Sequence, residues 1–262
     1  MSARESLLDT FPGRVFIKDL LRFRGSGGLP PTAFAGEVCP EHLIRHATDA
    51  VGRYLYSDGC DEVADLDVNE PEIQAFDTAA LEALAQLATF GSPQIHQGMI
   101  SELRAPSIRN RQRLNTVPDG AFWTSTPITD HEDSWTVSGE NLRRDHPRWE
   151  VHFDATAVRL ARIDSARDWI DLIESNPVTV DGCKCPNWPA IAQSWDAIHL
   201  SPAGLLLAYP TISMTPFTTT DGSGYAHSHA GPYASVGDWS AVSTAWLHEP
   251  PNVEFKGADV YK

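Results

Sequence analysis

The hydrophobic pattern of the chain changes near residue 90, and this change limits the folds that the sequence can adopt. Before it, apolar residues recur at steps of three and four, which is the spacing of one helix face. The spacing predicts a helix over Glu41–Leu55, after Pro40, and another over Asp77–Phe90, with Thr78 as its cap and Gly91 as its stop. After residue 91, short β-branched and aromatic runs alternate with polar segments, which is typical of strands.

The second part of the chain is therefore expected to contain a sheet. The predicted strands are Gln94–Ile100, Gly120–Thr126, Trp149–Phe153, Val158–Ile163, Ala197–Leu200 and Val242–Leu247. Ser165 caps a predicted helix over Ala166–Ile173, and a further helical segment over Trp188–Trp195 precedes a strand. We expect an α+β protein in which a helical region, residues 1–90, packs on the sheet of a second region, residues 91–262.

Composition limits the partners and the location that we expect. The 262 residues include 35 acidic and 20 basic side chains, which gives a net charge of −15. An acidic surface repels phosphate backbones, so broad nucleic-acid binding is not expected, although one basic groove is compatible with this charge. No apolar run is long enough to cross a bilayer, and the first residues include acids where a signal peptide is apolar. We expect a cytoplasmic protein without a membrane partner.

One predicted strand ends in consecutive hydroxyl side chains: Phe122, Trp123, Thr124, Ser125 and Thr126. Alternation sends Phe122 and Thr124 to one face of the strand, and Trp123 and Ser125 to the other. Hydroxyl groups offer donors and acceptors to a ligand, but they also satisfy backbone groups where a strand ends in a turn. Both interpretations stay open on the residues alone.

An earlier predicted strand carries His96, Gln97 and Gly98. A glycine after a polar pair lets a backbone or a flat ligand approach closely. A neutral histidine can donate to a ligand hydroxyl or carbonyl. The alternative interpretation is an edge-strand histidine without a ligand.

A later strand is preceded by Asp196 and contains His199. The pair is similar to the Asp-x-x-His block of SGNH-type hydrolases, in which the histidine acts as base for a nucleophilic serine. The Gly-Asp-Ser segment of those enzymes does not occur in this sequence. The pair still leaves a serine hydrolase as the alternative function, with Ser125, at the end of a predicted strand, as the candidate nucleophile.

Two patterns raise the question of a metal site. His227 and His229 would share one face of a strand, as in cupins, but the glutamate of the cupin pattern is missing. Cys183 and Cys185 are closer together than the Cys-x-x-Cys pair of structural zinc sites. Solvated loop histidines explain the first pattern, and we predict no metal ligand.

Taken in order, the motifs of residues 91–255 resemble those of ADP-ribosyltransferases. In that family a first core strand carries Arg or His followed within two residues by Gly, as His96–Gly98 does. A second strand carries an aromatic residue before Ser/Thr-rich residues, as Phe122–Thr126 does. A late strand supplies a catalytic Glu, and here Glu249 follows the predicted strand Val242–Leu247.

The resemblance implies a toxin-like mono-ADP-ribosyltransferase that uses NAD as substrate, on a split mixed or antiparallel sheet. His96, Gln97 and Gly98 would bind NAD together with Phe122–Thr126, and Phe122 or Trp123 would stack on the nicotinamide. The acceptor stays open between a protein, a nucleic acid and a small molecule. A binding module without catalytic activity is a further alternative.

The same resemblance assigns the catalytic roles. Glu249 would stabilise the positive charge that develops on the ribose, with His96 as a second catalytic residue and Asp238 as the second candidate acid. Arg24 would be an alternative to His96. The polar stretch Met214–Val236 predicts an extended loop, which we expect to close over NAD and to select the acceptor.

Overall fold

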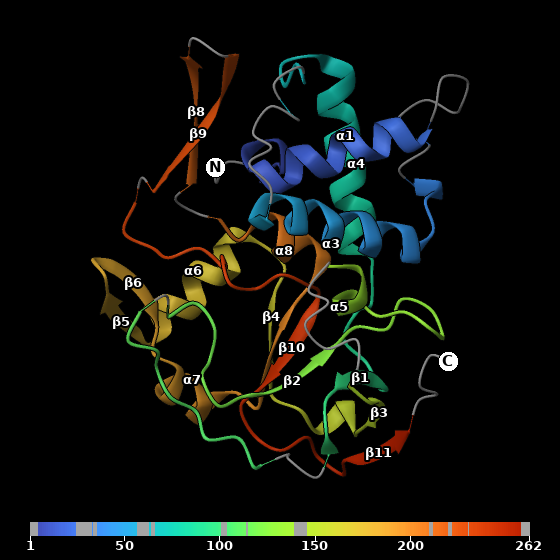
Figure 1. Cartoon of the computed structure of the whole chain (residues 1–262), viewed down its shortest axis with the longest axis vertical. Helices are drawn as coiled ribbons and strands as arrows, with labels where there is room; N and C mark the ends of the chain where they lie inside the picture. The colour runs from blue at the N-terminus through green and yellow to red at the C-terminus, as the bar shows by residue number, and fades with distance from the viewer. Residues whose placement is uncertain are drawn as a thin grey trace.

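The protein is an α+β structure in which N-terminal helices accompany a seven-stranded mixed sheet (Figure 1). The computed structural model describes residues 5–24, 33, 36–56, 63, 66–100, 104–113, 115–138, 146–209, 212–219, 222–229 and 231–257, with the backbone alone over 212–219 and 222–229. Within these ranges, no helix has both the length and the apolar character needed to cross a membrane.

Helices make up the first third of the chain and several connections between strands. The helical elements are η1 (Leu7–Asp9), α1 (Phe11–Arg24), α3 (Pro40–Tyr56), α4 (Pro71–Ala85), α5 (Ser134–Val137), η5 (Ala155–Ala157), α6 (Ala166–Ser175), α7 (Trp188–Ser194) and α8 (Pro202–Leu207). The strands are β1 (Gln94–Gln97), β2 (Phe122–Ser125), β3 (Arg148–His152), β4 (Leu160–Ile163), β5 (Pro177–Val180), β6 (Cys183–Pro186), β7 (Ala197–Leu200), β8 (Ile212–Thr219), β9 (Gly222–His229), β10 (Ser243–Trp246) and β11 (Glu254–Gly257).

The main sheet has the strand order β11-β3-β1-β2-β10-β7-β4. Neighbouring strands are antiparallel, except that β4 and β7 are parallel. The predicted α+β class and the mixed sheet are confirmed. The expected split of the sheet is not observed. The seven strands form one continuous sheet, and β5–β6 and β8–β9 form two separate pairs.

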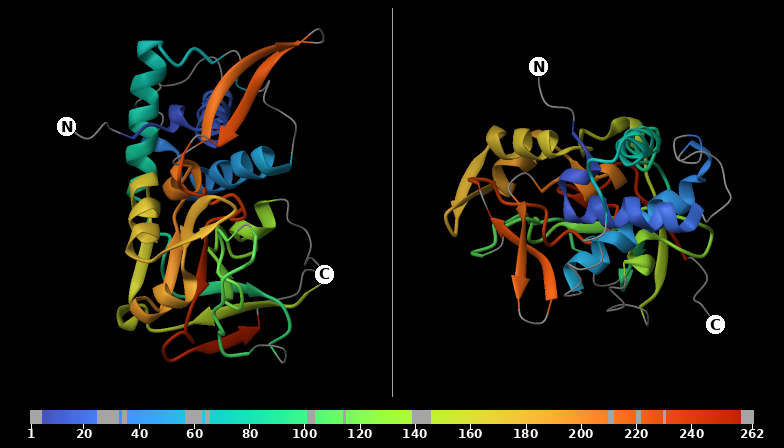
Figure 2. Two further views of the ribbon diagram at one scale, coloured as in Figure 1. Left: turned by 90° about the vertical axis from the view of Figure 1, so that its left-hand side faces the viewer. Right: turned by 90° about the horizontal axis from the view of Figure 1, so that it is seen from above.

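The two faces of the sheet are covered differently. On one face, Ile163, Ile198 and Ala245 belong to a large core that also contains the N-terminal helices and α6, α7 and α8. On the other face, Phe122 and Trp246 belong to a smaller, aromatic core. Figures 1 and 2 show the N-terminal helices at one end of the molecule and β11 at the opposite end. Several residues that pack on the face of Phe122, such as Phe90, Val158 and Val253, belong to connecting segments.

Three predicted helices are confirmed close to their expected bounds. α3 buries Leu43, Ala47 and Val51 on the face that the spacing indicated. α6 begins after Ser165, whose side chain accepts a hydrogen bond from the backbone N–H of Asp168. α7 begins at Trp188 as predicted.

The prediction for α4 was wrong at both ends. The helix begins at Pro71 and not at Asp77, because a proline in the first turn has no N–H to leave unsatisfied. Thr78 lies inside the helix, and the buried carboxylate of Asp77 accepts hydrogen bonds from the segment that leads into η1. The helix ends at Ala85, and Phe90 packs in the aromatic core of the sheet instead.

The helix α1 was not predicted, although Phe16, Ile17 and Leu20 are fully buried at helical spacing. Arg24, the alternative to His96, is the last residue of this helix and lies 3.8 Å from Glu72. It is not on a strand of the sheet, so this alternative is not supported.

The extended loop predicted over Met214–Val236 is also wrong over most of its length. β8 and β9 form an antiparallel hairpin, with Ile212 opposite His229 and Thr219 opposite Gly222. The stretch is rich in Thr, Gly, Ser and His, which favours a loop, but its threonines and aromatic residues are equally typical of strands. Figures 1 and 2 place this hairpin at the helical end of the molecule, far from β11.

Candidate functional site

The three strands that carry the predicted motifs are neighbours in the sheet. β2 lies between β1 and β10 and is antiparallel to both, with Thr124 opposite Thr244. The C-terminal ends of β1 and β10 therefore lie on either side of the N-terminal end of β2. This order places His96–Gly98 and Glu249 at the same end of the sheet, with Phe122 between them.

His96 packs closely against β2. Its ring centroid lies 4.8 Å from that of Phe122, and Nδ1–H donates to the carbonyl of Trp123 at 2.9 Å. A carbonyl can only accept, so the proton of a neutral His96 is on Nδ1. A Cβ atom at Gly98 would lie 2.7 Å from Nε2 of His96. Gly98 therefore makes room for the His96 ring, and not for a separate backbone or ligand as the sequence suggested.

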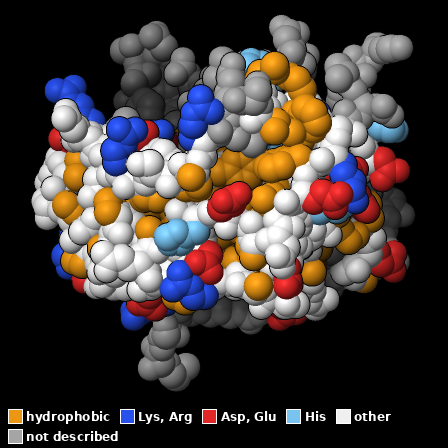
Figure 3. All heavy atoms as spheres, turned by 90° about the horizontal axis from the view of Figure 1, so that it is seen from below, with side chains coloured by type: hydrophobic (Ala, Val, Ile, Leu, Met, Phe, Trp, Pro, Cys, Tyr) orange, Lys and Arg blue, Asp and Glu red, His pale blue; other side chains and the backbone are white. Residues whose placement is uncertain are grey.

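A small pocket lies on the outer side of Phe122. Its volume is about 140 Å³, and its lining residues are Arg104, Ala105, Pro106, Phe122, Glu249, Pro250, Val253 and Phe255. The rings of Phe122 and Phe255 meet edge to face, with centroids 6.1 Å apart. Figure 3 views the molecule from the end that carries β11, where hydrophobic side chains form a strip beside acidic groups. The pocket thus combines aromatic walls with one carboxylate, from Glu249.

A row of buried polar groups crosses the same face of the sheet. Thr124 donates to the side-chain carbonyl of Gln94, whose amide donates to Thr244 Oγ1 at 2.9 Å. His199 lies between Thr244 and Thr89, with its Nδ1 2.9 Å and its Nε2 2.8 Å from their hydroxyls. Thr124 is therefore part of a satisfied core network, and its hydroxyl does not face the pocket.

The remaining residues of the two motifs lie on the opposite face. Gln97 donates to Asp133 at 3.1 Å, and the hydroxyl of the fully buried Ser125 donates to the carbonyl of Ile95 at 3.3 Å. Trp123 packs edge to face against Trp239, with ring centroids 5.0 Å apart. The structure therefore separates Gln97, Trp123 and Ser125 from the pocket that contains Phe122.

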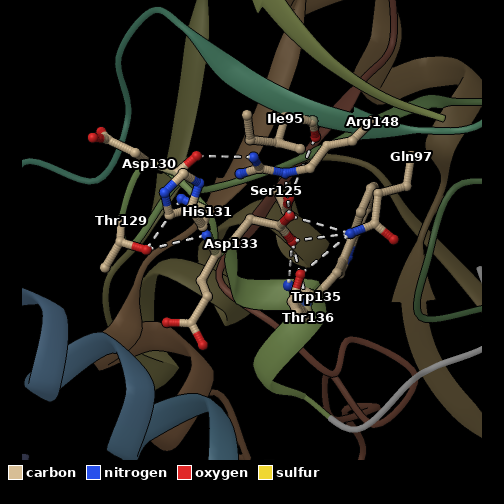
Figure 4. Close-up of polar contacts among 11 residues, drawn as sticks. Ile95, Gln97, Ser125, Thr129, Asp130, His131, Asp133, Trp135, Thr136 and Arg148 are labelled. Carbon is tan, nitrogen blue, oxygen red and sulfur yellow. Dashed lines mark hydrogen bonds and ion pairs between the residues drawn. The ribbon is translucent and has the colours of Figure 1, made fainter. Parts of the chain in front are cut away.

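Asp133 and Arg148 form a buried ion pair that the sequence did not indicate. Arg148 Nε lies 3.2 Å from Oδ2 of Asp133, and both side chains are nearly inaccessible. Asp133 also caps α5, since it accepts hydrogen bonds from the backbone N–H groups of Trp135 and Thr136. Figure 4 shows Gln97 and Arg148 reaching this carboxylate from two neighbouring strands. The cluster joins β1, β3 and α5, which indicates a structural role.

Two further predicted residues have partners away from the pocket. Thr126 is buried and donates to the carbonyl of Thr89 at 3.2 Å. Asp238, the second candidate acid, accepts from the hydroxyl of Thr116 at 3.0 Å and lies 3.5 Å from Arg111. Of the two candidate acids, only Glu249 lines the pocket beside Phe122.

The residues of the hydrolase alternative are not brought together. Asp196 pairs with Arg159 at 2.6 Å, and this hydrogen bond lowers the pKa of the carboxyl. His199 is held by two threonines, and burial lowers the pKa of its imidazole to about 3. Ser125 lies on the other face of the sheet and donates to a backbone carbonyl. No Ser-His-Asp relay exists among these three residues, and we do not propose a hydrolase.

Two pairs of residues were weighed as metal ligands. In the part of the chain that the structure describes, no group of three or more His, Cys, Asp and Glu side chains is arranged to hold a metal ion. Cys183 and Cys185 are on β6, and the side chains of His227 and His229 lie outside the described atoms.

The pocket residues Arg104, Val253 and Phe255 were missed by the sequence analysis. Phe255 is on β11, a strand at the edge of the sheet that is too short and polar to give a clear alternating pattern. Arg104 begins a segment rich in arginine, and this composition was a signal that could have been used. Comparison with protein-family models, with curated proteins and with solved structures gave no match to this chain.

Proposed function

We propose that the protein is a mono-ADP-ribosyltransferase that carries the motifs of that family on one continuous mixed sheet, and that it binds NAD at the pocket between Phe122 and Glu249. The supporting observation is the convergence of three separate motifs. β1, β2 and β10 are adjacent, and residues from the second and third motifs line one pocket beside the histidine of the first. Sequence positions so far apart have no local reason to meet in this order.

The pocket has the size and the chemistry for the nicotinamide end of NAD. A volume of about 140 Å³ holds one six-membered ring with a small substituent. Phe122 and Phe255 provide the aromatic walls on which such a ring packs. A pocket of this volume is too small for the whole dinucleotide, so the rest of NAD lies outside it.

The transfer breaks the bond between C1′ of the ribose and the nicotinamide nitrogen. Nicotinamide leaves with the electron pair of that bond as a neutral molecule, and C1′ then forms a bond to an acceptor oxygen or nitrogen, which loses a proton. Positive charge develops on the ribose in between. The carboxylate of Glu249 stabilises this charge, and the apolar walls of the pocket strengthen the interaction by excluding water.

His96 acts mainly through Phe122. Its side chain is only 6% exposed, and its ring lies against Phe122 while Nδ1–H is held by the carbonyl of Trp123. We therefore assign His96 to positioning the aromatic wall. A direct hydrogen bond from His96 to the adenosine-side ribose or to the nicotinamide stays a prediction.

Glu249→Gln tests the assignment of the catalytic acid. The substitution removes the negative charge but keeps the shape of the side chain. We expect the rate of nicotinamide release from NAD to fall by about 100-fold or more, since one electrostatic stabiliser of the transition state is lost. NAD binding, measured by calorimetry, is expected to change little.

Glu254→Gln is the matched control, since it removes the same charge from an exposed acid on β11 that does not line the pocket. It is expected to keep both activity and binding. The proposal fails if wild-type protein, incubated with adenine-labelled NAD and cell extract, gives neither nicotinamide release nor labelled product. If both variants release nicotinamide at the wild-type rate, Glu249 is not the catalytic acid.

One observation favours the alternative of a binding module. Glu249 follows the end of β10 and is exposed, whereas a catalytic carboxylate is usually shielded from water. Stabilisation of the protein by NAD in a thermal melt, together with no nicotinamide release over hours, would identify a module that binds NAD without turnover.

A further inference from the structure

One segment of this acidic chain is strongly basic. Residues 104–113 contain Arg104, Arg109, Arg111 and Arg113 and no acid, in a protein whose 35 acidic side chains outnumber its 20 basic ones. We call this segment the arginine loop. Its positive charge is a local exception on a surface that otherwise repels polyanions, so it focuses their approach to one place.

The arginine loop is fixed at the rim of the candidate pocket. Arg104 lines the pocket together with Glu249. Further along, the backbone of Arg109 exchanges two hydrogen bonds with that of Asp119, at 2.9 and 3.2 Å, directly before β2 begins. The N–H of Arg111 donates to the side chain of the buried Asn115 at 2.8 Å. The loop therefore has a defined path from the pocket towards Asp119 and beyond.

The side chains of Arg109 and Arg111 are exposed, and the ion pairs that they form are exposed too. Arg109 is 69% exposed and lies 3.2 Å from Asp119, whereas Arg111 is 44% exposed and lies 3.5 Å from Asp238. Exposed ion pairs of this kind contribute little to stability, so a guanidinium can exchange its carboxylate for a phosphate at little cost. Guanidinium groups also bind phosphate oxygens in a bidentate manner.

We propose that the arginine loop docks the phosphate backbone of a single-stranded nucleic acid, which is the acceptor of the transferred ADP-ribose. The second half of this statement rests on the proposed function. A single strand fits because its bases are free to reach the pocket mouth, whereas the base atoms of a duplex are inside the stack. Successive arginines match successive phosphates of one strand, and the acidic remainder of the surface keeps the strand on this path.

Binding is measured by fluorescence anisotropy of a fluorescein-labelled single strand of about twelve nucleotides, at several salt concentrations. The triple variant Arg109→Gln, Arg111→Gln, Arg113→Gln is expected to bind at least 10-fold more weakly than wild type at low salt. Each phosphate contact contributes about −0.7 to the slope of log affinity against log salt, so the loss of three contacts flattens this slope by about 2.

The control is a second triple variant with the same change in net charge: Arg159→Gln, Arg162→Gln, Arg167→Gln. These arginines are also exposed and paired with acids, but they lie on and near the edge strand β4, outside the arginine loop, and they do not line the pocket. It is expected to bind as wild type does. The docking proposal is overturned if wild type does not bind the strand at low salt, or if both triple variants lose affinity equally.

The acceptor role is tested separately with wild-type protein and adenine-labelled NAD. Label on the oligonucleotide supports it. Nicotinamide release without label on a strand that binds at the arginine loop overturns it. The absence of nicotinamide release counts against the proposed function and leaves the docking result standing, so the two failures are distinguishable. Circular dichroism of both triple variants at room temperature verifies that they are folded.

Discussion

His199 shows how the core accommodates a titratable group without making it reactive. Its two ring nitrogens lie within 2.9 Å of the hydroxyls of Thr89 and Thr244, so both are satisfied although the side chain is fully buried. Gln94 donates to Thr244 as well, which leaves the Thr244 hydroxyl proton for Nδ1 of His199. A ring nitrogen that accepts a hydrogen bond carries no proton, so His199 is neutral in this arrangement. Burial is the main cause of the low pKa of its imidazole.

The first prediction follows from the pKa of His199, which falls from 6.5 to about 3 on burial. The unfolded chain binds a proton below pH 6.5 and the folded protein does not, so stability is complete above this pH and decreases as the pH falls towards 3. Between pH 7 and pH 5, His199 alone is expected to reduce the free energy of unfolding by about 2 kcal/mol. Urea unfolding at both pH values measures this loss.

The comparison variant for this measurement is His199→Gln, which keeps hydrogen-bonding ends but does not titrate. Its free energy of unfolding at pH 7 is expected to be lower than that of wild type. Its additional loss between pH 7 and pH 5 is expected to be smaller than that of wild type by the contribution of His199. Parallel pH dependence of the two proteins contradicts the prediction.

The second prediction concerns Asp133. Asp133→Ala leaves the guanidinium of Arg148 buried without its ion-pair partner and removes the cap of α5, so a loss of about 3–5 kcal/mol in unfolding free energy is expected. Asp154→Ala removes another capping carboxylate, which is only half-buried and has no ion pair among the described residues, and it is expected to cost far less. Urea unfolding measures the loss of unfolding free energy in both variants. Equal losses would contradict the statement that the buried pair with Arg148 makes Asp133 the more important residue.

At the scale of elements, those marked by their own residues were predicted well, and those whose bounds depend on distant contacts were not. The strand at Ala197–Leu200 was predicted with its observed bounds because a short, mainly apolar run between polar residues marks it locally. The start of α4 is set by Pro71. Its end lies before Phe90, because Phe90 packs in the aromatic core on the sheet. The hairpin β8–β9 was missed because its glycines indicate a loop, although its threonines and aromatic residues are also typical of strands.

The third prediction concerns the hairpin β8–β9, which was expected to close over NAD. Its strands pair only with each other among the described strands, and it lies at the end of the molecule opposite β11. Since Ile212 is opposite His229, a short Gly-Ser linker can replace residues 212–229 without separating the flanking chain. We expect this variant to keep its melting temperature and its rate of nicotinamide release. A loss of nicotinamide release in this variant would mean that the hairpin takes part in the reaction.

At the scale of the whole molecule, the candidate site was only partly predictable. The order of motifs predicted that His96, Phe122 and Glu249 belong together, because each has a recognisable position in a strand pattern. Sequence could not say which face of β2 they share, so Trp123 and Ser125 were included although they point the other way. Face selection depends on the register with both neighbouring strands, which is a property of the assembled sheet.

The last prediction concerns the helical region, residues 1–90. Its helices share one core with the rest of the chain: Thr10 donates to the carbonyl of Leu206 at 2.7 Å, and the rings of Tyr54 and Tyr209 lie 5.5 Å apart. Alone, helices of this length are marginal in water and would expose that apolar surface. We expect residues 1–90 by themselves to show no cooperative thermal unfolding by circular dichroism, and co-expression with residues 91–262 to restore it. A sigmoidal melt of the isolated fragment would mean that the helices form a core of their own.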